Sequence, residues 1–135
     1  MAKIFIDAEK GVMGRICSYA AKQALQGNDI IIVNSEKALI SGTNTAIIQE
    51  FKEMRRLNTN KPEKGPFISR VPQKIMKRCV RGMIPDYRLG RGKIAFHKIK
   101  SYDGMPQEFK NEKMINFATD KPKKYITIEE LGRLA

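Results

Sequence analysis

Lysine and arginine side chains are concentrated between residues 51 and 100. This segment holds 15 of the 26 Lys and Arg residues but only three of the 14 acidic residues, so it alone accounts for the net charge of +12 of the 135-residue chain. The segments before and after it each carry equal numbers of basic and acidic residues. A charge excess of this size costs self-repulsion in a folded protein and usually serves an oppositely charged partner. The pattern therefore predicts a surface that binds a polyanion.

Residue types that could support catalysis or hold a metal are sparse. His97 is the only histidine and has no nearby cysteine or carboxylate pair with which to build a triad or a metal site. Cys17 and Cys79 lie on apolar helix faces, so we expect buried, inert thiols. The Gly11-x-x-Gly14 turn lacks the third glycine of a dinucleotide-binding loop. We therefore expect no enzyme, no cofactor, no metal and no small-molecule substrate.

Membrane association is also not expected. No apolar stretch approaches the length needed to cross a bilayer. The basic segment lacks the aromatic and leucine-rich face of an interfacial helix. Asp7 and Glu9 come too early for a secretory signal, which favours a cytoplasmic protein.

The first 42 residues predict an α/β fold. A short apolar strand at 3–7, a helix from Met13 to Ala24 and a second strand at 30–33 follow one another with short links, as in a parallel βαβ unit. Gly27-Asn28 supplies the stop after the helix. Residues 38–42 are compatible with either a short edge segment or a helical turn.

Two basic helices are predicted in the middle of the chain, separated by a loop at 58–72. The first spans 43–57, and the second spans 73–83 with four cations opposite an apolar arc. The arc contains Ile75, Met76, Cys79, Val80 and Met83.

The remaining elements are shorter. Residues 88–93 form a flexible basic element or the start of a short helix, and 94–102 contain a last strand with His97 on its surface. Thr127 followed by Glu130 predicts a capping box that opens a helix over 128–134.

The nature of the polyanion follows from what the basic segment lacks. It contains no zinc finger, basic zipper or helix-turn-helix pair for reading DNA sequence. Phe67 and Tyr87 are the only aromatic residues amid its basic groups before Phe96, too few for the stacking platforms of a single-strand binder. Structured RNA, held by its shape and phosphate backbone, is the remaining candidate.

Several blocks of the sequence resemble the characteristic blocks of one known family, the universal large-subunit ribosomal protein L-thirteen family in its archaeal form. The resemblance spans at least residues 4–104, and a tail block at 127–131 also supports the archaeal form. The blocks are Phe5-Ile6-Asp7-Ala8 with Gly14-Arg15, Ile32 to Ala38 with Ile40-Ser41-Gly42, Gly65-Pro66-Phe67, Arg70-Val71-Pro72, Val80-Arg81-Gly82-Met83-Ile84-Pro85 and Gly90-Arg91-Gly92. The chain departs from the family at Ile68 and Ser69, where His and Pro are frequent.

The resemblance implies a three-layer α/β/α fold with a small, mostly parallel four-stranded sheet in the order 3-2-1-4. It implies one rRNA-binding domain over 1–135, with a basic insertion at about 52–93 and a short C-terminal tail at about 105–135. The implied role is non-catalytic: binding large-subunit rRNA beside neighbouring large-subunit proteins in the cytoplasmic ribosome and supporting subunit assembly. The family signature and the charge pattern together give the expected RNA-binding residues: Arg55, Arg56, Lys61, Lys64, Arg70, Lys74, Lys77, Arg78, Arg81, Arg88, Arg91 and Lys93.

Two other functions fit parts of the sequence. A regulator that binds messenger RNA outside the ribosome would use the same basic surface. A small nucleotide-dependent enzyme would use the glycine turn and Arg15 at the start of the first helix.

Overall fold

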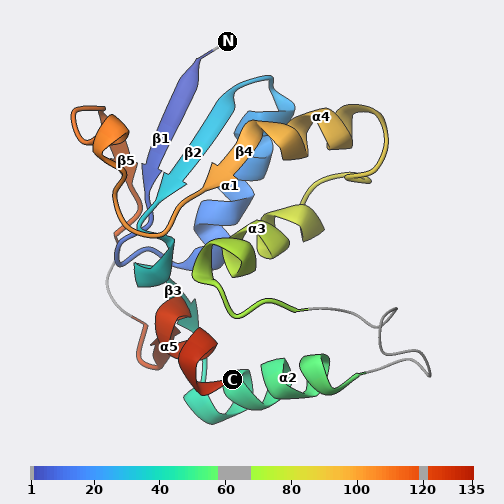
Figure 1. The fold of residues 1–135 in the computed structure, drawn as a ribbon, viewed down its shortest axis with the longest axis vertical. Helices are drawn as coiled ribbons and strands as arrows, with labels where there is room; N and C mark the ends of the chain where they lie inside the picture. Colours follow the sequence, from blue (N-terminus) through green and yellow to red (C-terminus); the bar gives the residue numbers. More distant parts are fainter. Residues whose placement is uncertain (1, 58–67, 119–121) are drawn as a thin grey trace.

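A parallel β-sheet of four strands organises the fold (Figure 1). The computed structural model describes residues 2–57, 68–118 and 122–135. The central strands β1 and β2 are in register from Lys3 opposite Asp29 to Asp7 opposite Val33. In order across the sheet, the strands are β4 (Ile99–Ser101), β2 (Asp29–Val33), β1 (Lys3–Asp7) and β5 (Met114–Asn116).

The predicted α/β class and strand order are confirmed. All three strand pairs of this sheet are parallel, and its strands, numbered in chain order, lie as 3-2-1-4. β2 is buried over its last four residues, as its unbroken apolar run predicts for a strand covered on both faces.

Three helices cover one face of the sheet and form the main core with it. Ile6, Ile30, Ile32 and Ile99 of the sheet pack there against buried residues of the helices. The small residues of α1, among them Ala20 and Ala24, are buried and allow a close approach to the strands. The helices are α1 (Met13–Leu25), α3 (Pro72–Gly82) and α4 (Gly90–Lys98).

A loop covers the opposite face of the sheet. Phe5, Ile31 and Val33 form a second, smaller cluster on that face. The segment after β4 packs on this cluster and includes a single 3-10 turn, η3 (Gln107–Phe109), whose Phe109 ring lies 5.3 Å from that of Phe5.

A second sheet of two antiparallel strands lies at one end of the molecule with two helices (Figure 1). The predicted capping box is present, since the Thr127 hydroxyl accepts a hydrogen bond from the backbone N–H of Glu130 (3.2 Å). Ile126, Ile128 and Leu131 are fully buried there. The elements are β3 (Leu39–Ser41), β6 (Tyr125–Thr127), α2 (Asn44–Arg56) and α5 (Ile128–Leu134).

The structure assigns residues 38–42, whose conformation the sequence leaves open. Leu39 to Ser41 form β3, and the strand pairs with β6, whose existence the sequence analysis did not predict. β5 was not predicted either, so residues 105–135 contribute one strand to each sheet.

The last strand predicted within 94–102 is present as β4, and α4 begins within 88–93, where the sequence allowed the start of a short helix. Two other sequence predictions are wrong. α4 continues through 94–98, so His97 lies on its exposed side and not on the surface of a strand. Met83 follows the last residue of α3 and is 42% exposed, so it is not part of the apolar face.

In the described residues, no helix has both the length and the apolar character needed to span a membrane.

Candidate nucleic-acid interface

Helix α3 separates apolar from cationic side chains as its sequence predicts. Ile75, Met76 and Val80 are buried against the core. None of the four cations on the other side of the helix is buried. Because these cations project from a helix whose inner face is fixed, their backbone positions are set before any ligand arrives. The four are Lys74, Lys77, Arg78 and Arg81.

A hollow of about 250 Å³ brings the four cations together with Ser69 and Phe96. The Lys77 ammonium lies over the Phe96 ring, 4.7 Å from its centroid. Partial burial, and then the positive charge of Lys100, lower the pKa of Lys77. The basic surface therefore extends from α3 to Lys100 on the edge strand β4, and a bound anion would relieve the repulsion between the two ammonium groups.

A second hollow, of about 540 Å³, lies beside the first and shares Ser69 and Lys74 with it. Arg55 of α2 lines this hollow together with Arg70. Burial, and then the charge of Arg70, lower the pKa of Arg55. The Arg55 guanidinium donates a hydrogen bond to the Ala135 carbonyl oxygen, so part of its donor capacity is already used within the protein.

The segment between α3 and α4 adds a third group of cations. Arg88 is exposed, as are Arg91 and Lys93 in the first turns of α4. That helix begins without a side-chain cap and without an acidic residue in its first turn, so its free backbone N–H groups add to the positive potential.

Carboxylates do not neutralise this surface in the described part of the chain. Among the described residues, none of the expected RNA-binding residues forms a salt bridge. The ion pair that the structure shows there joins Lys37 to Glu9 (3.9 Å), two residues outside the basic segment. Unpaired cations gathered on one surface are the arrangement that phosphate groups bind.

Comparison with known proteins identifies the family. The family model described as ribosomal protein L13 matches residues 2–108. The chain belongs to the ribosomal protein L13 family. The large ribosomal subunit protein uL13 of Methanococcoides burtonii is 38% identical over 133 residues, which cover 95% of this chain and 94% of the relative. The protein of the same name from Thermoplasma volcanium is 39% identical over 131 residues, with 95% and 94% covered.

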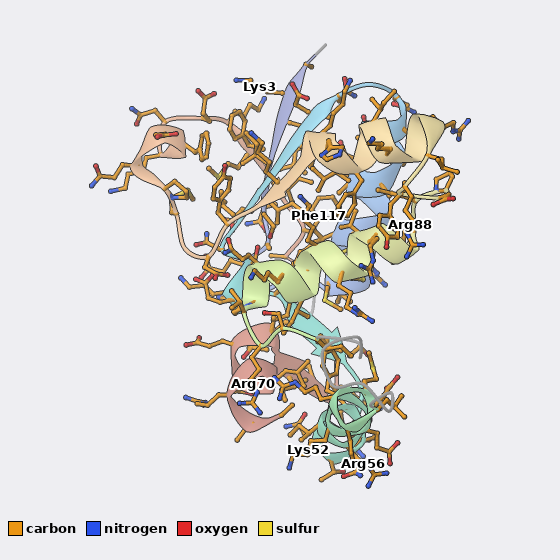
Figure 2. All side chains as sticks on the ribbon, turned by 45° about the vertical axis from the view of Figure 1, so that its right-hand side comes forward. Lys3, Lys52, Arg56, Arg70, Arg88 and Phe117 are labelled. Carbon is orange, nitrogen blue, oxygen red and sulfur yellow. The ribbon has the colours of Figure 1, made fainter. Side chains whose placement is uncertain are left out.

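The structure divides the expected RNA-binding residues of this L13 family member into groups. Lys61 and Lys64 lie outside the described residues. Arg55 and Arg70 share the larger hollow with Lys74, and the cations of α3 share the smaller one. Arg56 is the last residue of α2. Figure 2 shows Arg56 by α2, Arg70 beside α5, and Arg88 near the end of α3, so the surface is long rather than compact.

Pattern analysis missed the aromatic part of this surface. The Tyr87 and Phe96 rings lie 5.8 Å apart, and three cations lie over them, an arrangement that the sequence analysis did not predict. The predicted strand within 94–102 was not confined to 99–101, and this concealed the pair. A helical assignment of 90–98 would have placed Phe96 on the side of α4 that meets the preceding loop.

Proposed function

We propose that this chain is a structural, non-catalytic constituent of the large ribosomal subunit, where its one domain binds large-subunit rRNA. The observation that carries the proposal is the cationic face of α3, whose four side chains share one hollow and have no carboxylate partner among the residues that the structure describes. Family membership supports it, since the relatives are named large ribosomal subunit proteins.

The binding mechanism follows from the division between scaffold and surface. The parallel sheet and α1 hold the inner face of α3, and the outer face presents ammonium and guanidinium groups to the RNA. Release of counterions from the RNA backbone supplies most of the affinity. Arginine guanidinium groups also bind a phosphate through two parallel hydrogen bonds. Shape and backbone, rather than base sequence, would then determine which RNA fits.

We assign the RNA contacts to the three described groups of cations. The residues are Arg55, Arg56, Arg70, Lys74, Lys77, Arg78, Arg81, Arg88, Arg91 and Lys93, and on sequence grounds Lys61 and Lys64. Lys100 joins them because it approaches Lys77. Neighbouring large-subunit proteins would contact the remaining surface in the cytoplasmic ribosome, and the domain would support subunit assembly.

Crosslinking in cells followed by sequencing of the bound RNA tests the proposal. We expect most reads to come from large-subunit rRNA, and the protein to sediment with that subunit after a mild salt wash. A variant with the four α3 cations replaced by glutamine should lose both properties. Reads that come mainly from messenger RNA, or recovery of the wild-type protein only in the free fraction, would contradict it.

A further inference from the structure

Two arginines converge on a single tyrosine at the end of the basic surface. The guanidinium carbon of Arg81, in the last turn of α3, lies over the Tyr87 ring at 4.9 Å from the centroid. That of Arg88 lies over the same ring at 5.2 Å. The Arg88 Nε–H also donates a hydrogen bond to the Tyr87 hydroxyl (3.1 Å). We call these three residues the Tyr87 clamp.

The loop that carries Tyr87 is held in place by its own contacts. The Asp86 carboxylate accepts a hydrogen bond from the backbone N–H of Arg88 (3.0 Å), and the Tyr87 ring packs on Phe96 of α4. α4 approaches the loop so closely that a Cβ at Gly92 would overlap the carbonyl oxygens of Pro85 and Asp86. The position of the tyrosine is therefore set by α4, whereas Arg81 comes from α3.

The guanidinium groups of the clamp form no salt bridge within the described residues, although the Tyr87 hydroxyl, and then the charge of Asp86 at longer range, raise the pKa of Arg88. Among the described residues, no carboxylate lies within salt-bridge distance of Arg81 or Arg88. Both guanidinium carbons lie about 5 Å from the same ring centroid, so the distance between the two groups is at most about 10 Å. One phosphate or two consecutive phosphates can span a separation of this size, and binding them breaks no salt bridge of either arginine among the described residues.

The geometry also favours one class of ligand. A guanidinium that stacks on an aromatic ring uses its flat face and leaves its N–H groups at the edge free to donate. Those edges match the oxygens of a phosphate group. A nucleobase would instead need the ring of Tyr87, and the two guanidinium groups already lie over it.

We infer that the Tyr87 clamp is a binding site for the RNA backbone, in which Tyr87 orients Arg81 and Arg88 onto one phosphate or two consecutive phosphates. The inference rests on the proposed function and assigns a positioning role to a residue that carries no charge. Ordering the two long side chains before binding reduces the entropy that is lost when RNA arrives.

The test is the salt dependence of affinity, measured for the intact chain and a transcript of large-subunit rRNA from about 50 to about 200 mM salt. We expect Arg81→Gln and Arg88→Gln each to reduce the slope of log affinity against log salt by about one unit. Tyr87→Leu should reduce it by about one to two units and weaken binding about tenfold, although it removes no charge. Arg81→Gln should then reduce the RNA affinity less in the Tyr87→Leu background than in the wild type.

Tyr19→Leu is the matched control, because Tyr19 is also half-buried and packs on a phenylalanine, with its ring 5.2 Å from that of Phe117. This variant should keep the full slope. Tyr87→Phe keeps the ring for stacking and should retain most of the effect of the clamp, which covers the case in which Tyr87→Leu does not fold.

Three results would overturn the inference. A Tyr87→Leu variant that binds less tightly with an unchanged slope would show that a base stacks on the ring. An unchanged affinity would show that the clamp does not contact RNA, and full additivity with Arg81→Gln would show that Tyr87 does not orient that arginine. Failure of the wild-type chain to bind the transcript would instead overturn the proposed function.

Discussion

Helices α2 and α3 have similar sequences in outline but different places in the molecule. Both carry an apolar stripe and end in basic residues. α3 buries three residues in the main core, whereas α2 has no buried residue and lies at the far end of the molecule beside α5 (Figure 1). The same amphipathic pattern therefore produces a fixed platform in one case and a peripheral element in the other, and what differs is the surface available to cover the stripe.

Removing one large apolar side chain from each helix tests this difference and should have the largest effect. Met76→Ala deletes a fully buried side chain and should lower the free energy of unfolding by about 2–5 kcal/mol. Phe51→Ala deletes a half-buried one on α2 and should cost only about 1 kcal/mol. Urea denaturation followed by circular dichroism measures both. Equal losses would mean that α2 is as much a part of the core as α3.

Two glycines, Gly82 at the end of α3 and Gly92 in the first turn of α4, test how firmly the loop between these helices is held. A Cβ at Gly92 would overlap the carbonyl oxygens of Pro85 and Asp86, whereas a Cβ at Gly82 would meet nothing within 4 Å. Gly92→Ala should therefore destabilise the protein by about 1–3 kcal/mol and weaken RNA binding, because the loop after α3 must move. Gly82→Ala should change stability by less than about 1 kcal/mol, in the favourable direction. A stable Gly92→Ala variant would mean that α4 does not fix the loop.

Replacing a single arginine on α3 should reduce the RNA affinity of the protein more than replacing one on α2. Arg78→Ala removes a cation from the hollow on α3 and should weaken rRNA binding about tenfold, with little change in the melting temperature. Arg56→Ala removes an exposed cation from the end of α2 and should weaken it less than about threefold, since more conformational freedom must be lost there on binding. A larger loss for Arg56→Ala would reverse the ranking of the helices.

The smallest expected effect concerns the pH dependence of stability near the start of α3. Burial, and then the charge of Glu36, raise the pKa of Asp103, although a hydrogen bond from the backbone N–H of Gln73 acts in the opposite direction. Because the folded chain binds this proton more tightly than the unfolded chain, the wild type loses stability as the pH rises through the raised pKa. Asp103→Asn should therefore melt slightly higher than the wild type at pH 7.

The advantage of Asp103→Asn should disappear when the pH falls below the ordinary carboxyl value of 3.8, where Asp103 is protonated in both states. Melting curves of the two proteins across this pH range measure the difference. An advantage that does not change with pH would mean that the carboxyl group of Asp103 is not perturbed by folding.

Elements that depend on local sequence could be predicted. β1, α1 and β2 follow from apolar spacing and the Gly27 stop, and α5 follows from its capping box. The cationic face of α3 follows from helical geometry applied to its own residues. In each case the residues that determine the structure lie within about one helical turn or one strand of each other.

Elements that depend on distant partners could not be predicted. β5 and β6 have three residues each and are strands because β1 and β3 pair with them. α4 contains Gly90 and Gly92, which disfavour a helix, but Gly92 is needed for close packing against the loop after α3. The Tyr87 clamp brings Arg81 of α3 together with two residues of the following loop, which α4 holds in place. Because the full extent of α4 was not predicted, the clamp was not predicted either.

The central claim is that the cationic face of α3 binds rRNA phosphates while the rest of the domain acts as its scaffold. The most direct test compares the salt dependence of rRNA affinity between the wild type and a variant with Lys74, Lys77, Arg78 and Arg81 all replaced by glutamine. A matched control replaces four exposed cations from outside the basic segment by glutamine: Lys22, Lys110, Lys113 and Lys123. The account predicts that the slope falls by about three to four units in the first variant and changes by less than about one unit in the control. Equal slopes in the two variants, with both proteins folded, would contradict it.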